Sequence, residues 1–310
     1  EIASCLVGSE MCIRDRGETM KMKVFKTIQE QISILESKGL IIDDYLFTED
    51  ILIRENYFFI SGYRHLFLKS PKDRNFIKGT TFRELYALFN FDRQVRNIVF
   101  KNLLIIENNL KSIISYQLSK KYGFREKDYL KPENFTKVPD KQRQLSDTLK
   151  KMKRQIRVNG AQHSATSHYL KNYGYIPLWV VVKVLSFGIV GELYTVMKRE
   201  DQEEIAGIYD LSVNNLLTYL PILSNYRNLC AHEDILYDHR TQKIIGDTRY
   251  HDGLDIPTTD GEYIYGKDDL FALIIILKQL LRPEEFRLLI NELSYELSLI
   301  HISEPTRQEA

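Results

Sequence analysis

One long segment without helix-breaking residues constrains the fold of this chain more than any other feature. Residues 82–122 contain neither glycine nor proline, and their apolar residues recur at intervals of three or four. This spacing places the apolar side chains on one face of an α-helix, so the segment predicts one long helical region. The residues on that face are Val95, Val99, Leu103, Leu110 and Ile114, with Ile98, Ile106 and Ile113 beside them.

Both ends of this segment carry signals for a helix boundary. Thr81 and Glu84 stand three residues apart, which is the spacing of a capping box, and Gly123 is a typical residue after a helix end. A helix of about 40 residues is long for a globular domain, so we expect a break near residues 90–92.

Most of the remaining sequence also favours helices. Only 8 prolines and 15 glycines occur among the 310 residues, so few positions interrupt a helical pattern. Ser212 is a candidate N-cap, and Pro221 should kink or divide the helix that follows it. Residues 240–265 look irregular, with a small hairpin expected at 244–248. Further helices are expected at about 20–38, 48–68, 141–157, 178–197, 268–282 and 284–297. The sequence therefore predicts a mainly α fold.

Composition and charge exclude several classes of protein. Hydrophobic residues make up 44% of the chain and charged residues 27%, which is the profile of a folded chain rather than a disordered one. A net charge of +1 excludes a uniformly basic nucleic-acid binder, although it is compatible with a local basic groove. No apolar run approaches the length of about 18 residues that a membrane-spanning helix needs.

The two ends of the chain differ from the rest. Residues 1–17 and 298–310 resemble translated sequencing-adapter read-through, and we expect both to be artefacts flanking a domain at 18–297. The first end does not read as a signal peptide either, because its apolar run at residues 2–7 is short and no basic residue precedes it. Without these ends Cys230 is the one remaining cysteine, so no internal disulfide can form and a cytoplasmic location is expected.

The segment 226–232 carries the residues best suited to chemistry. Arg227 precedes Asn228 directly and stands five positions before His232. The planar arginine fork suits two phosphate oxygens, and a histidine can take a proton from a ribose 2′-hydroxyl near neutral pH. Together they can support transesterification of RNA, in which the 2′-oxygen attacks the adjacent phosphorus, without a metal or another cofactor.

The spacing of this motif leaves other interpretations open. Five residues correspond to about 140° on an ideal helix, so Arg227 and His232 do not share a face. One motif also supplies one histidine, which suggests a composite site made by two chains. A structural interpretation pairs Arg227 with an acidic neighbour and packs His232 at a helix end. A zinc site is a further alternative, although its spacing matches no recognised pattern. Its ligands would come from Cys230, His232, Asp234, His239 and His251.

Several short segments occur in an order that is typical of one known family. They are residues 56–63 (NYFFISGY), 76–82 (FIKGTTF), 91–96 (FDRQVR), 106–107 with Lys111, 177–180 (PLWV), 185–188 (LSFG) and 226–232 (YRNLCAH). Over roughly residues 20–240, the chain resembles the Abi-like (AbiD/AbiF) abortive-infection family, a branch of the HEPN ribonuclease superfamily. One departure is Lys183, which stands where many relatives are expected to carry a glutamate.

The resemblance implies a HEPN-type helical bundle with additional N-terminal helices and a polar, basic insertion at 124–176. It also implies a homodimer that pairs two motifs in one site. Arg227 and His232 would be catalytic, Asn228 would support them, and Glu107 would orient Arg227 or His232. From the residues alone, Glu107 fits an ion pair with Lys111 four positions later equally well.

A run of basic residues within 141–157 is a candidate RNA contact, although such runs are usually solvated helix faces. The residues expected to bind RNA are Lys111, Lys150, Lys151, Lys153, Arg154 and Arg157. Trp179 and its aromatic neighbours are expected in the core rather than as platforms for stacked bases.

We therefore expect a metal-independent endoribonuclease of bacterial antiphage defence. One alternative is a non-catalytic RNA-binding or regulatory protein with the same fold. Another is a toxin held inactive by a partner protein or small RNA, which adds an antitoxin or a small non-coding RNA to the expected partners, RNA and a second copy of the chain.

Overall fold

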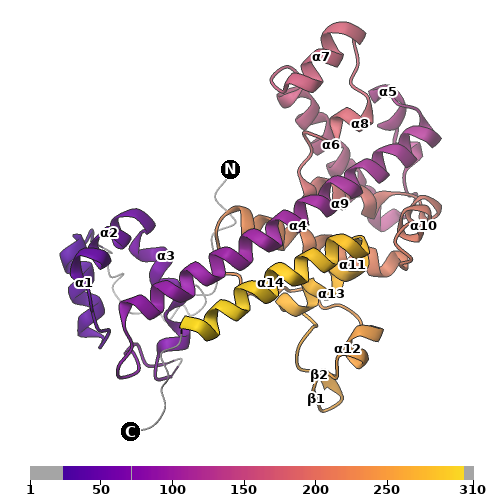
Figure 1. Ribbon diagram of the computed structural model, residues 1–310. Coiled ribbons are helices and arrows are strands. Elements are labelled where there is room, and N and C mark those ends of the chain that lie inside the picture. Colours follow the sequence, from indigo (N-terminus) through magenta and orange to yellow (C-terminus); the bar gives the residue numbers. More distant parts are fainter. Residues whose placement is uncertain (1–23, 71, 304–310) are drawn as a thin grey trace, which may run out of the picture. The chain divides into compact units, whose positions relative to one another are not determined.

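The structure, a computed structural model, describes residues 24–70 and 72–303 (Figure 1). Two artefacts were expected, at 1–17 and at 298–310. The whole of the first and residues 304–310 of the second lie outside the described residues. The described part is mainly α-helical, as predicted, and includes a small two-stranded sheet. The chain divides into two compact units, with the boundary between Tyr86 and Ala87. Across the described residues, no helix combines the length and apolarity needed to cross a bilayer.

The first unit consists mainly of short helices. The helix expected from residue 20 begins only at residue 28, because Thr27 and Glu30 form a capping box. Asn56 adopts a left-handed φ of 65° and divides the helix that was expected to run from Thr48 through residue 68. The elements are α1 (Ile28–Ser37), α2 (Tyr45–Glu55), α3 (Tyr57–Gly62) and the 3-10 helix η1 (Tyr63–Phe67).

The long helix α4 (Phe82–Tyr122) is continuous, so the break expected at residues 90–92 is wrong. The predicted capping box is present, since the Thr81 N–H donates to Glu84 Oε2 (2.8 Å) and the Glu84 N–H donates to Thr81 Oγ1 (3.2 Å). Asp92 does not interrupt the helix because its side chain is buried and binds backbone groups of a distant segment.

The second unit packs α4 among later helices. Val99, Leu103, Leu110 and Ile114 on α4 are buried, as their spacing predicted. Figure 1 shows α14 alongside α4, where Lys101 lies 2.6 Å from a glutamate of α14. The elements are α5 (Glu126–Tyr129), η2 (Pro132–Asn134), η3 (Pro139–Lys141), α6 (Gln142–Asn159), α7 (Ser164–Tyr173), α8 (Leu178–Val181), α9 (Phe187–Val196), α10 (Arg199–Gly207), α11 (Val213–Ala231), α12 (Arg249–Gly253), β1 (Thr258–Thr259), β2 (Glu262–Tyr263), α13 (Leu270–Leu280) and α14 (Pro283–Ser303).

Two local expectations for this unit need correction. The hairpin lies at β1 and β2 rather than at 244–248, because Asp260 and Gly261 both have positive φ and form a two-residue turn. The apolar stretch 178–197 holds two helices rather than one, since the Ser186 hydroxyl accepts the Ile189 N–H and caps α9. Pro221 lies inside α11 without dividing it.

Candidate active site

α11 places the motif residues at its C-terminal end. The predicted N-cap is confirmed, because Ser212 Oγ accepts the Asn215 N–H at 3.1 Å. The last turns bury Tyr226 and leave Arg227 half-buried and Asn228 exposed. His232 follows as the C-cap residue, and its N–H donates to the Asn228 carbonyl at 3.0 Å. The motif therefore lies at the boundary between the core and the surface.

A buried carboxylate on α4 holds Arg227. Glu107 Oε2 accepts a hydrogen bond from Arg227 Nε at 3.0 Å, and Glu107 Oε1 accepts one from Lys111 Nζ at 2.7 Å. Glu107 therefore contacts Arg227 and also forms the ion pair with Lys111, so both expected contacts of its carboxylate are present. Sharing one carboxylate between two hydrogen-bonded cations also offsets the cost of burying its charge.

Arg227 leaves its terminal nitrogens available. The Arg227 side chain keeps 31% of its surface exposed, and Phe100 packs beside it with the ring centroid 6.0 Å from Cζ. Within the described part of the chain, Nη1 and Nη2 make no hydrogen bond. An arginine fixed at Nε and open at both terminal nitrogens can bind two oxygens of a phosphate.

The other two motif side chains face solvent. Asn228 and His232 are exposed, and neither side chain makes a hydrogen bond with a residue that the structure describes. Among the described residues, no hydrogen bond or ion pair joins Arg227 to His232, and a turn of about 140° separates the two positions on an ideal helix. A single chain therefore offers a fixed cation and an accessible imidazole without joining the two.

A second polar cluster holds the loop that follows the motif. Asp92 is fully buried and accepts the N–H groups of Leu236 (3.0 Å) and Tyr237 (2.8 Å). Arg96, also buried, donates through Nη1 to Asp92 Oδ2 (2.9 Å) and to the Asp234 carbonyl (3.0 Å). These contacts fix the chain two to five residues after His232. Charged residues four apart within an apolar helix face are typical of a buried pair, although neither Asp92 nor Arg96 was predicted to have a role in the site.

His239 is a further histidine that the structure places beside α11. Its Nε2 lies 2.6 Å from Asn225 Oδ1, and its ring meets the Tyr226 ring edge-on at 5.1 Å. Burial lowers the pKa of His239, and the negative charge of Asp234 opposes this effect. Asn225 stands three residues before Asn228 and seven before His232, so these side chains share a helix face.

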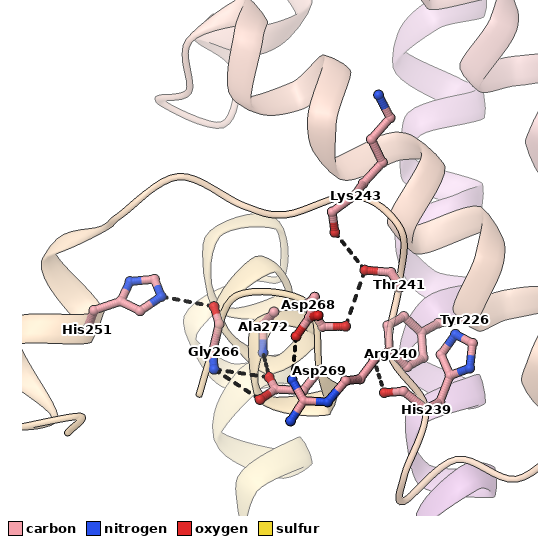
Figure 2. Close-up of polar contacts among 10 residues, drawn as sticks. All are labelled: Tyr226, His239, Arg240, Thr241, Lys243, His251, Gly266, Asp268, Asp269 and Ala272. Atoms are coloured by element: carbon pink, nitrogen blue, oxygen red, sulfur yellow. Dashed lines mark hydrogen bonds and ion pairs between the residues drawn. The ribbon is translucent and has the colours of Figure 1, made fainter. Parts of the chain in front are cut away.

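Figure 2 shows how the segment after His239 is anchored to the start of α13. Arg240 Nη1 lies 2.6 Å from Asp268 Oδ1, and the Thr241 N–H donates to the Asp268 carbonyl at 2.7 Å. Asp269 caps α13 by accepting the Ala272 N–H at 2.9 Å. The segment that carries His239 is therefore attached at both of its ends.

The residues of the zinc alternative are not gathered at one point. Cys230 is buried, and burial raises its pKa to about 12. His251 is buried elsewhere, with Nε2 2.9 Å from the Gly266 carbonyl (Figure 2). Among the described residues, no three His, Cys, Asp or Glu side chains lie together in a way that could hold a metal ion.

The residues expected to bind RNA fall into different surroundings. Lys111 is buried against Glu107, whereas Lys151 lies 2.5 Å from Glu192 and Lys150 lies 3.8 Å from Asp147. Arg154 is exposed on α6. Lys153 and Arg157, also on α6, line a pocket of about 460 Å³ together with other cations. The predicted RNA contacts are thus divided among a buried site on α4 and, on α6, an ion-paired face, an exposed arginine and a pocket.

Comparison with known families identifies the family of this chain. A family model described as Abi-like protein matches residues 50–238, which is more than half of the sequence. The chain belongs to the Abi-like family. No curated protein and no solved structure gives a significant match. Membership of the Abi-like family suggests a role in abortive-infection defence.

The matched region of this Abi-like protein contains both polar clusters. Asp92 and Arg96 lie within it, as do Glu107, Arg227 and His232, whereas His239 lies one residue beyond its end. The match therefore includes the residues that connect α4 to the end of α11 and to the loop after it.

Proposed function

We propose that this Abi-like protein is a metal-independent endoribonuclease with the HEPN fold, acting in antiphage defence. The observation that supports this most directly is the state of Arg227. Its Nε is bound to the buried Glu107, and its terminal nitrogens are open beside an exposed helix end. An arginine held in this way is preorganised for binding an anion.

In the proposed reaction, the terminal nitrogens of Arg227 bind the oxygens of the scissile phosphate. His232 takes the proton from the ribose 2′-hydroxyl, and the 2′-oxygen attacks phosphorus. The bond from phosphorus to the 5′-oxygen breaks, and that oxygen receives a proton from a second imidazole. The products are a 2′,3′-cyclic phosphate and a 5′-hydroxyl. Arg227 stabilises the charge that develops on the phosphate during the attack.

Asn228 and Glu107 support this chemistry without taking part in proton transfer. Glu107 orients Arg227, and the exposed Asn228 amide lies one residue from it, where it can donate to a phosphate or ribose oxygen. Lys111 donates a charge-assisted hydrogen bond to the second carboxylate oxygen of Glu107. In this proposal Lys111 is therefore a positioning residue rather than an RNA contact.

The second imidazole comes from the His232 of another copy in a homodimer. One motif supplies one histidine, and the angle between Arg227 and His232 on α11 separates them within a chain. A composite site requires association, so specific activity should fall when the protein is diluted below its dimerisation constant. Full activity from a protein that sediments as a monomer would contradict this part of the proposal.

The central test is incubation of the purified protein with total RNA, followed by analysis of the fragment ends. We expect cleavage that persists in EDTA and leaves 2′,3′-cyclic phosphates. Arg227→Ala and His232→Ala should each reduce the rate by about 100-fold or more, which is the usual contribution of such groups. The exposed residues Arg287 and His65, changed to alanine, provide matched controls.

Circular dichroism and thermal unfolding must show that both variants remain folded. RNA that is bound but stays intact with the wild-type protein would favour the non-catalytic RNA-binding alternative. Growth arrest on expression, relieved by a neighbouring gene or small RNA, would identify the toxin alternative that shares this chemistry.

A further inference from the structure

A ladder of aromatic rings lies near the C-terminal end of α4. The Phe124 ring centroid is 5.9 Å from that of Trp179 and 5.7 Å from that of Tyr175. Tyr175 is followed by Tyr173 at 6.4 Å and Tyr173 by Tyr169 at 5.4 Å. The rings come from the segment after α4, from α7, from the connection after it and from α8, so tertiary folding brings Phe124 to the others.

The ladder is open to solvent, which corrects the expectation that Trp179 belongs to the core. Tyr173 is 58% exposed, Trp179 46% and Phe124 39%. Large aromatic side chains normally bury most of their surface, and a contiguous exposed group of them is typical of a binding surface.

Several cations on or next to this ladder have no acidic partner among the described residues, although Lys131 of the adjoining pocket pairs with Asp128. Arg125 Cζ lies 5.2 Å from the centroid of the Tyr175 ring. The pocket of about 460 Å³ contains Lys127, Lys153 and Arg157, none of which forms an ion pair with any described residue. Glu126 is the one acidic residue in the lining. Its carboxylate binds the backbone rather than one of these cations, because Oε1 accepts the Ile176 N–H at 2.6 Å.

A second pocket of about 450 Å³ connects the rings to these cations. It is lined by Arg125, Tyr173 and Tyr175 and shares Glu126 and Lys127 with the first pocket. Rings and unpaired positive charges therefore form one continuous surface. This combination is typical of single-stranded nucleic-acid binding, in which bases stack on aromatic faces and phosphates meet cations.

We propose that this surface, made of the ladder and the two pockets, binds single-stranded RNA. The bases stack on Tyr173, Trp179 and Phe124, and the phosphates face Lys127, Lys153 and Arg157. The inference rests on the proposed function, since it takes RNA as the ligand. It adds the place where the strand is held and the requirement that its bases be unpaired, because paired bases cannot reach the rings.

The surface lies apart from the candidate active site along the same helix. Glu107 and Tyr122 are fifteen residues apart on α4, which corresponds to about 22 Å along its axis. A strand that reaches both places must be several nucleotides long. Oligonucleotides too short to span this distance should therefore be poorer ligands and poorer substrates.

The test measures binding in a His232→Ala background, so that the RNA stays intact. The probe is a fluorescein-labelled 12-nucleotide uridine RNA, and the measurement is fluorescence anisotropy. Tyr173→Ala and Trp179→Ala should each weaken binding roughly 10-fold or more, as loss of a stacking ring does elsewhere. Tyr173→Phe should bind like the parent, because the aromatic face remains.

Charge variants test the other half of the surface. Lys127→Ala and Arg157→Ala should weaken binding and lower the slope of log affinity against log salt by roughly one unit each. Tyr295→Ala, which removes a ring that is 63% exposed on α14, and Arg287→Ala are the matched controls and should change affinity less than about 2-fold. A duplex of the same length should bind less tightly than the single strand.

Several results would overturn the inference. They are RNA affinity unchanged in both ring variants, equal losses in the control variants, duplex binding as tight as single-strand binding, or no RNA binding at all. If the ring variants sediment differently from the parent but bind RNA equally well, the surface mediates protein association, and the inference is also overturned. Binding that depends on the rings, with no cleavage by the wild-type protein, would contradict the proposed nuclease alone.

Discussion

Two acid–base pairs on the same helix have the same spacing and different consequences. On α4, Asp92 precedes Arg96 by four residues, and Glu107 precedes Lys111 by four residues. Both pairs are buried, so their local chemistry is nearly identical. The difference lies in what else each carboxylate binds. Asp92 accepts two backbone N–H groups of the loop after the motif, whereas Glu107 accepts the half-exposed Arg227.

This difference separates a structural pair from a candidate catalytic pair. The carboxylate of Asp92 binds the protein's own backbone and leaves no exposed cation. The carboxylate of Glu107 holds a guanidinium whose other nitrogens face outward. A buried ion pair is by itself weak evidence for either role, and the third partner decides the assignment.

The largest expected effect comes from breaking the Asp92 cluster. Asp92→Ala should lower the free energy of unfolding by about 3–5 kcal/mol, because it removes the buried carboxylate that binds Arg96 and the N–H groups of Leu236 and Tyr237. Urea unfolding followed by circular dichroism measures the change. Asp147→Ala removes a solvent-exposed partner of Lys150 and should change stability by less than about 0.5 kcal/mol. Equal effects in the two variants would refute the structural assignment of Asp92.

The next effect concerns activity rather than stability. Glu107→Gln keeps the side-chain shape but removes the charge that fixes Arg227, and we expect the RNA cleavage rate to fall about 100-fold through misplacement of the guanidinium. The substrate concentration at half-maximal rate should change much less. An unaltered cleavage rate in a folded Glu107→Gln protein would show that Arg227 needs no anchor.

A smaller effect is expected at Lys111, where substitution should lower stability but change the cleavage rate little. Lys111→Met leaves Glu107 paired with Arg227, so we expect a loss of about 1–2 kcal/mol in stability and cleavage within about fivefold of the parent. The double variant Glu107→Gln/Lys111→Met removes both buried charges. It should regain stability relative to Glu107→Gln without regaining cleavage, and joint recovery of both would contradict the proposed roles.

The smallest effect is the dependence of stability on pH at His239. Because burial lowers its pKa in the folded protein, the unfolded chain binds the proton more readily. The neutral ring therefore contributes fully above the unfolded pKa of about 6.5, and stability declines as pH falls from there toward the lower folded value. The difference in unfolding free energy between the parent and His239→Gln, measured from pH 8 to pH 5, should follow this decline. A difference that stays constant with pH would argue against the burial of His239.

Much of the architecture could be predicted from local patterns. The capping signals at Thr81 and Ser212 and the apolar spacing along α4 each depend on residues within a few positions, so sequence alone reveals them. The same reasoning failed at residues 90–92, where helix length argued for a break. The failure has a physical cause, since the two backbone N–H groups that Asp92 binds lie more than 140 residues later in the chain.

Part of the candidate site could be predicted from the sequence. The spacing of Arg227 and His232, together with the family resemblance, drew attention to the motif and to Glu107, and their catalytic roles stay predictions. The pair Asp92 and Arg96 showed only the spacing of a buried ion pair, and His239 was considered only as a ligand of the zinc alternative. The exposed aromatic ladder was misjudged because aromatic residues are usually buried, and composition does not show which side of a helix faces solvent.

The sequence by itself determined that this protein is mainly helical and where many of its helices begin, since capping and periodicity act over a few residues. It also determined which side chains could bind a phosphate or move a proton. Only the tertiary structure decided that one carboxylate of α4 holds a loop and the other holds Arg227. Two acids that each precede a basic residue by four positions acquire different roles from the distant group that folding brings within about 3 Å of each.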